Sequence, residues 1–127
     1  MSVAVTKGVR VEVEPEFLPA QSDPAEGLWV YAYHVTITNE SPRTVQLLAR
    51  HWVITNGEGT EEHVKGPGVV GETPVLRPGQ AFRYSSGCPL GTPIGAMHGT
   101  YQMRDDEGQR FEVEIAPFTL AEPGSLN

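Results

Sequence analysis

Apolar and charged residues alternate with a period of two near the start of the chain. Val9, Val11 and Val13 are each followed by a charged residue, as expected for a strand that buries one face. We expect this strand to end at Pro15, because proline cannot donate a hydrogen bond to a strand ladder. A polar, proline-containing loop is expected to follow.

A longer alternating run covers residues 29–38 and consists mainly of aromatic and β-branched residues. These residue types are enriched in strands, so we predict a strand here. One face of this strand carries Tyr31, Tyr33, Val35 and Ile37, and the other carries Val30, Ala32, His34 and Thr36.

Further short runs of the same kind follow, separated by turn-forming residues. They cover residues 44–55, 60–64, 81–86, 97–103 and 109–115. In the first of these runs, Leu48, Trp52 and Ile54 are assigned to one side. Residues 56–59 (Asn-Gly-Glu-Gly) and 106–108 (Asp-Glu-Gly) tolerate the backbone of tight turns, so each predicts a hairpin.

Seven or eight short strands at this spacing are typical of an all-β, antiparallel two-sheet sandwich. Cys88 is the only cysteine, so no disulfide can join the sheets as in immunoglobulin domains. Within the immunoglobulin-like folds, we therefore expect the fibronectin type III kind. Residues 1–127 are predicted to form one domain, with a core from about residue 3 to about residue 120.

Charge and composition narrow the class of partner and the compartment. A formal charge of −7 without a basic run disfavours nucleic acid, because its phosphates are also negative. A single cysteine favours a reducing compartment, and charged residues from Lys7 onward interrupt any secretory segment at the N-terminus. Because no long apolar span occurs, we expect no membrane crossing and a cytoplasmic protein.

Gly66, Gly68 and Gly71 have the G-x-G-x-x-G spacing of loops that bind the pyrophosphate of dinucleotides. Such a loop requires a helix that opens at the third glycine and an acidic residue about 20 positions later. Pro74 and Pro78 oppose a helix, and residues 88–91 contain no carboxylate. We therefore interpret the three glycines as a structural turn between strands.

The region of residues 66–87 combines this glycine spacing with characteristic proline, aromatic and small residues. These are Pro74, Leu76, Pro78, Gly79, Phe82, Tyr84, Ser86 and Gly87. Flanking matches occur at 45–48, 50–54, 92–95 and 117–118, and at Met97, Gly99, Tyr101, Met103 and Phe111. Together these motifs resemble the ApaG family over nearly the whole chain.

The resemblance implies a fibronectin-type sandwich, and it implies no reaction. Bacterial members of the family are linked with cobalt and magnesium resistance and with genes for dinucleoside polyphosphate hydrolysis. The domain also occurs in eukaryotic F-box and polymerase-interacting proteins. A domain found in such different proteins is more easily understood as a non-enzymatic protein–protein interaction module, without a cofactor, than as an enzyme.

Catalytic residues would have to be brought together from distant positions. Ser85, Ser86 or Cys88 would need His98 beside it to act as a nucleophile, and no nucleophile motif surrounds any of them. We therefore predict no catalytic centre.

Candidate metal ligands are similarly dispersed. The histidines His34, His51, His63 and His98 lack the short spacing of common zinc sites. Asp105, Asp106 and Glu107 cluster, but a solvated turn explains them equally well. We predict no metal site.

The loop of residues 66–74 is the predicted interaction surface for a protein partner. Its candidate residues are Gly66, Pro67, Gly68, Val69, Val70, Gly71 and Pro74. Apolar side chains in a surface loop often mark a partner site. Alternatively, Val69 and Val70 fold back over the edge of the sandwich.

A second alternative is that the loop and nearby residues bind a pyrophosphate-containing nucleotide or a divalent cation. Lys65, Arg77 and Arg83 would assist anion binding if they converged on the backbone amides of the loop. Against this, Pro67 has no amide donor, and the neighbouring Glu61, Glu62 and Glu72 repel anions.

Overall fold

Nine β-strands make up most of residues 1–123, the part of the chain that this computed structural model describes. The strands are β1 (Ser2–Thr6), β2 (Val9–Phe17), β3 (Trp29–Asn39), β4 (Val45–Asn56), β5 (Glu61–Pro67), β6 (Val75–Leu76), β7 (Ala81–Leu90), β8 (Ile94–Asp105) and β9 (Arg110–Ala121). Two single 3₁₀ turns, η1 (Pro19–Gln21) and η2 (Pro24–Glu26), lie between β2 and β3. None of the described residues belongs to a helix long and apolar enough to cross a membrane.

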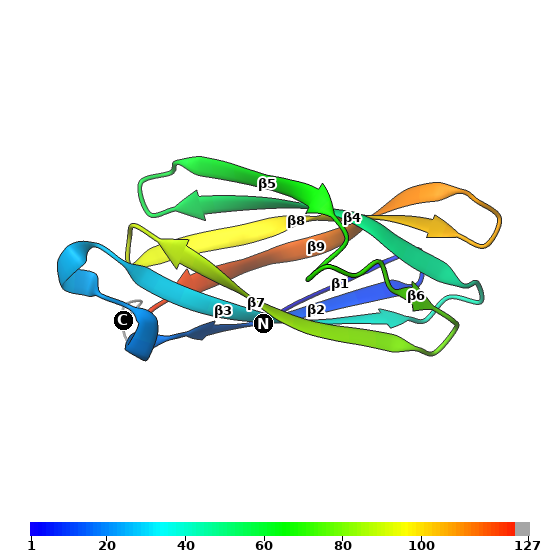
Figure 1. The fold of residues 1–127 in the computed structure, drawn as a ribbon, viewed down its shortest axis with the longest axis horizontal. Coiled ribbons are helices and arrows are strands. Elements are labelled where there is room, and N and C mark those ends of the chain that lie inside the picture. Colours follow the sequence, from blue (N-terminus) through cyan, green and yellow to red (C-terminus); the bar gives the residue numbers. More distant parts are fainter. Residues whose placement is uncertain (124–127) are drawn as a thin grey trace.

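The strands form two antiparallel sheets that pack against each other (Figure 1). One sheet has the order β1-β2-β3-β7, and the other has the order β5-β4-β8-β9, with β6 paired to β4. The predicted all-β, antiparallel two-sheet sandwich is confirmed. The predicted hairpins also form, since the Asn56 amide donates to Thr60 and the Asp105 amide donates to Gln109.

The structure has more strands within residues 1–123 than the seven or eight predicted, because the alternating pattern does not reveal β1 and β6. β1 is an edge strand, and its Val3 and Val5 face solvent, so its alternation marks no buried apolar face. β6 has two residues, which is too short to show a period.

Pro15 does not end its strand, so that prediction is wrong. β2 continues to Phe17, and Pro15 pairs with Tyr33 of β3. β1 pairs with β2 only as far as Val13, so β2 has a single neighbour beyond that point. Proline is tolerated there because a strand edge lacks one set of ladder bonds.

A β-bulge between Leu47 and Ala49 decides which side chains of β4 enter the core. Leu47 is buried, whereas Leu48 is only partly buried and does not share the alternation of Trp52. One extra residue in a strand reverses the alternation on its far side. The assignment of Leu48 to the face of Trp52 is therefore wrong.

Trp52 lies at the centre of the core. Its ring centroid is 5.1 Å from that of Tyr33, on the opposite sheet, and 6.0 Å from that of Phe118. The hydroxyl groups of Tyr84 in β7 and Tyr101 in β8 hydrogen-bond across the core, which joins the two sheets. The predicted apolar face of β3 is buried as a whole.

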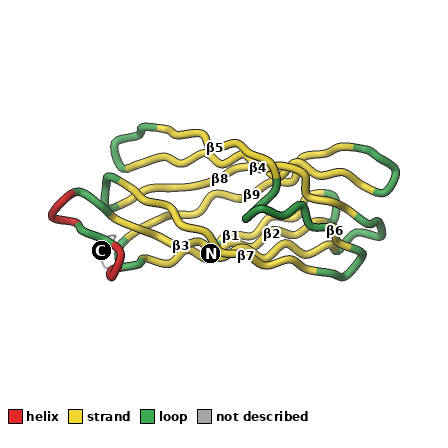
Figure 2. The backbone as a smooth tube through the Cα atoms, in the orientation of Figure 1, coloured by secondary structure: helices red, strands yellow, loops and turns green. Residues whose placement is uncertain are grey.

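The two long sides of the sandwich differ. On one side the edge strands β1 and β9 meet, and the amide of Glu114 donates to the Thr6 hydroxyl at 3.1 Å. On the other side β5 and β7 are the edge strands, and the connection from β5 to β6 leaves the ladder there (Figure 2). This second side carries the predicted interaction loop.

Candidate functional site

Gly68 is the glycine of the loop with the least room for a side chain. Its φ is 59°, and a Cβ at this position would lie 2.3 Å from the carbonyl oxygen of Glu72. Gly71 also has a positive φ, of 80°, but open space surrounds it. A Cβ on Gly66 would lie 3.0 Å from the guanidinium of Arg50. The glycines therefore meet needs of turn geometry and close packing.

Residues 69–72 form a two-residue hairpin turn. The amide of Val69 donates to the carbonyl oxygen of Glu72, and the amide of Glu72 donates to that of Val69, both at 2.8 Å. Val70 and Gly71 between them have φ values of 43° and 80°, as in a type I′ turn. Positive φ is a genuine outlier for a β-branched residue such as Val70. This backbone conformation costs a residue with a side chain about 1–2 kcal/mol.

Arg50 of β4 holds the first end of the loop. Its Nη1 donates to the carbonyl oxygens of Pro67 at 2.9 Å and Gly68 at 3.0 Å. The amide of Gly68 in turn donates to the carbonyl oxygen of Leu48, at the bulge of β4, at 2.8 Å. The loop is thus fixed to β4 where it leaves β5.

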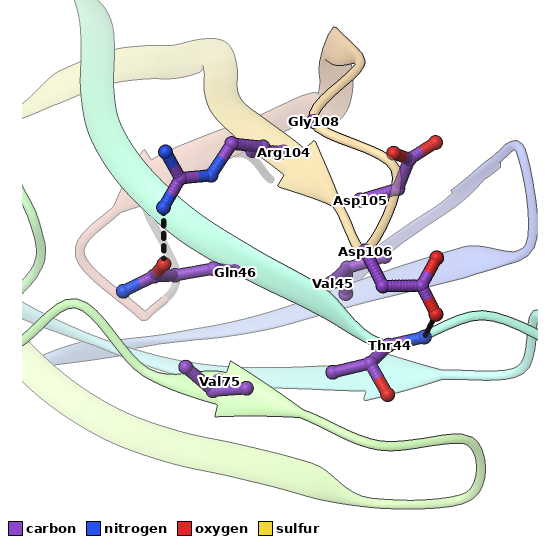
Figure 3. A pocket seen from close by; sticks show the side chains of 8 residues that line it. All are labelled: Thr44, Val45, Gln46, Val75, Arg104, Asp105, Asp106 and Gly108. Atoms are coloured by element: carbon purple, nitrogen blue, oxygen red, sulfur yellow. Dashed lines mark hydrogen bonds between the residues drawn. The ribbon is translucent and has the colours of Figure 1, made fainter.

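Gln46 and Leu47 of β4 hold the second end. The amide of Leu47 donates to the carbonyl oxygen of Pro74 at 3.0 Å, and the side-chain amide of Gln46 donates to that of Thr73 at 3.1 Å. Arg104 of β8 donates to the side-chain oxygen of Gln46 at 3.0 Å (Figure 3). Because both ends are fixed, the loop presents a defined surface.

The apolar side chains of the loop divide between core and surface. Val69 is fully buried, so the expectation that it lies at the surface is wrong. Val70 is 56% exposed, and Val75, just beyond the loop, is 55% exposed. Pro67 is exposed and Pro74 is partly buried. Val69 therefore covers the edge of the core, while Val70 lies at the surface.

The backbone of the loop has few amides left for an anion. The amides of Gly68, Val69 and Glu72 all donate within the protein, and Pro67 has no amide hydrogen. The loop leads into strand β6, so no helix begins at Gly71. The geometry lacks the helix N-terminus that binds the pyrophosphate in dinucleotide folds.

Two of the cations named as possible helpers lie on opposite outer faces of the sandwich. Lys65 pairs with His51 on the outer face of one sheet, and Arg83 pairs with Thr36 on the outer face of the other. The cation at the loop is Arg50, which the motif did not single out. The sequence did indicate that Arg50 faces the core side of its strand, because Arg50 lies two residues before Trp52 and residues i and i+2 share a strand face.

A groove runs between β5 and β7 beneath the loop. Its two parts have volumes of about 280 and 360 Å³. Both are lined by Tyr33, Arg50, Trp52 and Ser86. Val64 and Cys88 line the first part, whereas Val70 and Tyr84 line the second. Within residues 1–123, no carboxylate lies within ion-pair distance of Arg50, and the indole N–H of Trp52 has no hydrogen-bond partner.

The candidate nucleophiles do not meet His98. His98 pairs with Val53 on the outer face of the five-stranded sheet, whereas Ser85 lies in β7 of the other sheet. Cys88 is buried, and this burial raises the pKa of its thiol to about 11. A thiol with that pKa remains protonated near neutral pH and is a poor nucleophile.

Ser85 instead contacts His34. Its Oγ lies 2.6 Å from Nδ1 of His34, whose Nε2 lies 2.9 Å from Oε1 of Glu16. Ser85, His34 and Glu16 are thus arranged like a nucleophile, a general base and the carboxylate that orients the base. However, the side chains of His34 and Glu16 are 45% and 57% exposed on the outer face of a sheet. Water reaches the site freely, so the arrangement lacks the preorganised, water-excluded environment that stabilises an oxyanion.

The acidic residues at the hairpin between β8 and β9 make ion pairs and hydrogen bonds within the protein. Nη1 of Arg43 lies 3.1 Å from Asp106 and 2.7 Å from Glu107. Asp105 accepts the amide of Glu107 at 2.9 Å, and Figure 3 shows the Asp106 carboxylate directed at the backbone of Thr44. In the described part of the chain, no group of three or more His, Cys, Asp or Glu residues is placed to hold a metal ion.

Two histidines far apart in the sequence do come together. His51 Nε2 of β4 and His63 Nδ1 of β5 are 2.9 Å apart on the outer face of the sheet. Partial desolvation and the positive charge of Lys65 lower the pKa of His51. Sequence spacing gave no sign of this contact, since it depends on how β4 and β5 pair.

Comparisons with known proteins give the same family, and they cover most of the chain. The model of the ApaG domain (DUF525) matches residues 19–105. Protein ApaG of Parvibaculum lavamentivorans is 51% identical over 123 residues, which cover 97% of this chain and 95% of that protein. Protein ApaG of Rhodospirillum centenum is 55% identical over 119 residues, which cover 94% of this chain and 92% of that protein.

A solved structure is also similar to this chain in fold and sequence. The crystal structure of the putative ApaA protein from Bordetella pertussis matches with a TM-score of 0.90 and 50% sequence identity. The match covers 92% of this chain and 95% of that chain. The loop and groove described above therefore occur in a fold that the relatives share.

Proposed function

The chain belongs to the ApaG family, and from this membership and the geometry of the loop we propose that it is a non-enzymatic module that binds another protein. The recognition surface is the loop of residues 66–74, together with Val75 and the groove beside it. Any effect on cobalt or magnesium resistance, which the family resemblance implies, would act through the bound partner.

The observation that carries this proposal is the conformation of Val70. A valine at a φ of 43° strains the backbone, and glycine or asparagine would occupy this turn position at lower cost. The side chain is also 56% exposed, so most of its surface contributes no burial to folding. Contact with a partner would offset both costs, because it would bury the apolar side chain.

The fixed ends of the loop support the same function. Arg50 and Gln46 hold the backbone on both sides of Val70, so little conformational entropy is lost when a partner binds. The groove below adds concave walls and the guanidinium of Arg50, which suits a partner with an acidic or carbonyl group.

The alternative functions have less support. The amides of Gly68, Val69 and Glu72 are already bonded, which leaves a pyrophosphate few backbone donors. The carbonyl oxygens of Pro67 and Gly68 accept hydrogen bonds from Arg50, and the positive charge of this side chain repels a divalent cation.

Val70→Ser tests the proposal, with Val5→Ser as the matched control. Val5 is 57% exposed on β1, at the edge strand of the other long side, so both variants remove a similar exposed valine. Immobilised wild-type and variant chains are incubated with extract of the native cell, and captured proteins are quantified by mass spectrometry. Val70→Ser should lose specific proteins that wild type and Val5→Ser retain. Identical capture by all three chains would overturn the proposal.

A further inference from the structure

The outer face of the five-stranded sheet brings two imidazole rings together. Val53 of β4 pairs with His63 of β5, and His51 pairs with Lys65, so His51 and His63 are diagonal neighbours on one face. Their facing atoms, Nε2 of His51 and Nδ1 of His63, are 2.9 Å apart, and the ring centroids are 5.1 Å apart. The paired strands hold both residues without a loop.

We propose that His51 and His63 chelate a divalent transition-metal ion of the Ni²⁺ class through these two nitrogens, with water completing its coordination. This site lies on the face of β4 opposite to Trp52 and the groove, so it is separate from the proposed protein-binding surface. Imidazole nitrogen is a preferred ligand for such ions.

The nitrogen spacing favours one coordination geometry. Metal–imidazole bonds are about 2.1 Å long, so two nitrogens 2.9 Å apart subtend an angle of about 90° at the ion. That angle fits adjacent positions of a six-coordinate or square-planar ion. A tetrahedral ion such as Zn²⁺ would require a separation of about 3.4 Å with bonds of this length. The spacing of the metal-free pair is therefore closer to the one that Ni²⁺ requires.

Glu61 favours the tautomer of His63 that a metal requires. Its Oε1 lies 3.3 Å from Nε2 of His63, on the side of the ring away from His51. A proton on Nε2 leaves Nδ1 with a free lone pair, and a carboxylate at the outer nitrogen is the usual support of a metal-bound histidine.

Binding changes the tautomer of His51 and releases no proton from two neutral rings. With the proton of His63 on Nε2 beside Glu61, the short contact between the two rings requires that His51 Nε2–H donates to His63 Nδ1 when no metal is bound. In the bound state the proton of His51 resides on Nδ1, and small ring rotations direct both free lone pairs at the ion. The side chain of His63 is 49% exposed, so it has room to rotate and water can reach the ion.

The surrounding charges tolerate a cation. Lys65 is the positive neighbour of the pair, while Glu61 and Glu112 are negative neighbours. His98 lies on the same face, across Val53 from His63. Since no group of three ligating residues forms within residues 1–123, the affinity should be that of a two-imidazole chelate.

The test uses the full chain without a polyhistidine tag, and NiCl₂ alone as the probe, at pH 7.5. Calorimetry should show one Ni²⁺ per chain, and paramagnetic broadening in NMR spectra should centre on His51 and His63. His51→Gln and His63→Gln should each weaken binding at least tenfold. Glu61→Gln, which keeps both ligands, should weaken it about tenfold.

His34→Gln is the matched control, because His34 is an exposed strand histidine of the other sheet. It should bind Ni²⁺ like wild type, and thermal unfolding should show that all variants fold. Wild-type affinity in His63→Gln, or broadening centred on Met1 or His98, would overturn the proposal. These outcomes are independent of partner capture by Val70, so the two proposals can fail separately.

Discussion

Val69 and Val70 are consecutive residues, yet Val69 is fully buried and Val70 is 56% exposed. The left-handed backbone of Val70 reverses the chain directly after Val69, so the two side chains cannot share a surface. One valine therefore contributes to folding, and the other lies at the surface, where the proposed partner would contact it. This division makes the roles of the two residues separable by substitution.

Val69→Ala should lower the free energy of unfolding by about 2 kcal/mol, because it removes buried methyl groups and leaves a cavity. Val70→Ser should change it by less than about 0.5 kcal/mol, since surface substitutions usually do. Val70→Gly should stabilise the chain, because relief of about 1–2 kcal/mol of backbone strain exceeds the roughly 0.5–1 kcal/mol that glycine adds through the entropy of the unfolded state. Urea denaturation measures all three. Equal losses for Val69→Ala and Val70→Ser would contradict the assignment.

Gly68→Ala and Gly71→Ala separate steric contact from backbone conformation. Both glycines have positive φ, so each substitution should cost about 1 kcal/mol for conformation alone. Only at Gly68 would the new Cβ meet a backbone atom, the Glu72 oxygen at 2.3 Å. Gly68→Ala should therefore be clearly the more destabilising variant in thermal unfolding. Equal midpoints for the two variants would show that the turn relaxes freely.

Arg50→Met should loosen the loop, because it removes the donor to Pro67 and Gly68 while keeping an apolar stem. Hydrogen bonds from charged groups contribute about 1.5–3 kcal/mol, so a loss near the lower value is expected. Hydrogen exchange should accelerate at the amides of Val69 and Glu72.

Arg10→Met is the control for Arg50→Met, since Arg10 makes a surface ion pair with Glu12. Exposed pairs contribute about 0–1 kcal/mol, so this variant should leave exchange in the loop unchanged. If Arg50→Met also leaves it unchanged, the loop does not depend on Arg50 for its order.

Titration of ¹⁵N-labelled protein with ATP or a dinucleoside polyphosphate should give no saturable shifts at Gly66, Gly68 or Gly71. The amides of the loop are largely bonded within the protein, and no helix N-terminus follows. Saturable shifts at micromolar ligand would instead favour the nucleotide-binding alternative over the protein-binding proposal.

His51 should titrate below the usual histidine value of about 6.5. Because partial desolvation lowers its pKa, the folded chain binds this proton less readily than the unfolded chain. The stability that His51 contributes is then fully present above pH 6.5 and is lost as pH falls through the lowered folded pKa. NMR of the imidazole protons reads the pKa directly. A value at or above 6.5 would contradict the prediction.

Period-two alternation was sufficient to predict the sandwich and most of its strands. The buried face of β3 follows directly from the alternation of Tyr31, Tyr33, Val35 and Ile37, because a strand turns successive side chains to opposite faces. The absence of a helix after Gly71 was equally readable, because Pro74 and Pro78 act on the backbone near them. These are local properties, and local residues determine them.

Contacts between strands and with the loop depended on register and on backbone irregularities. The bulge at Leu48 changed the face of β4, and the pairing of β4 with β5 placed His51 beside His63. Arg50 reached the carbonyl oxygens of the loop through the same pairing. Such contacts join residues 12 or more positions apart, and a shift of one residue in strand pairing would turn every side chain to the other face. Tertiary packing therefore decided the site, while the alternation of residues decided the fold.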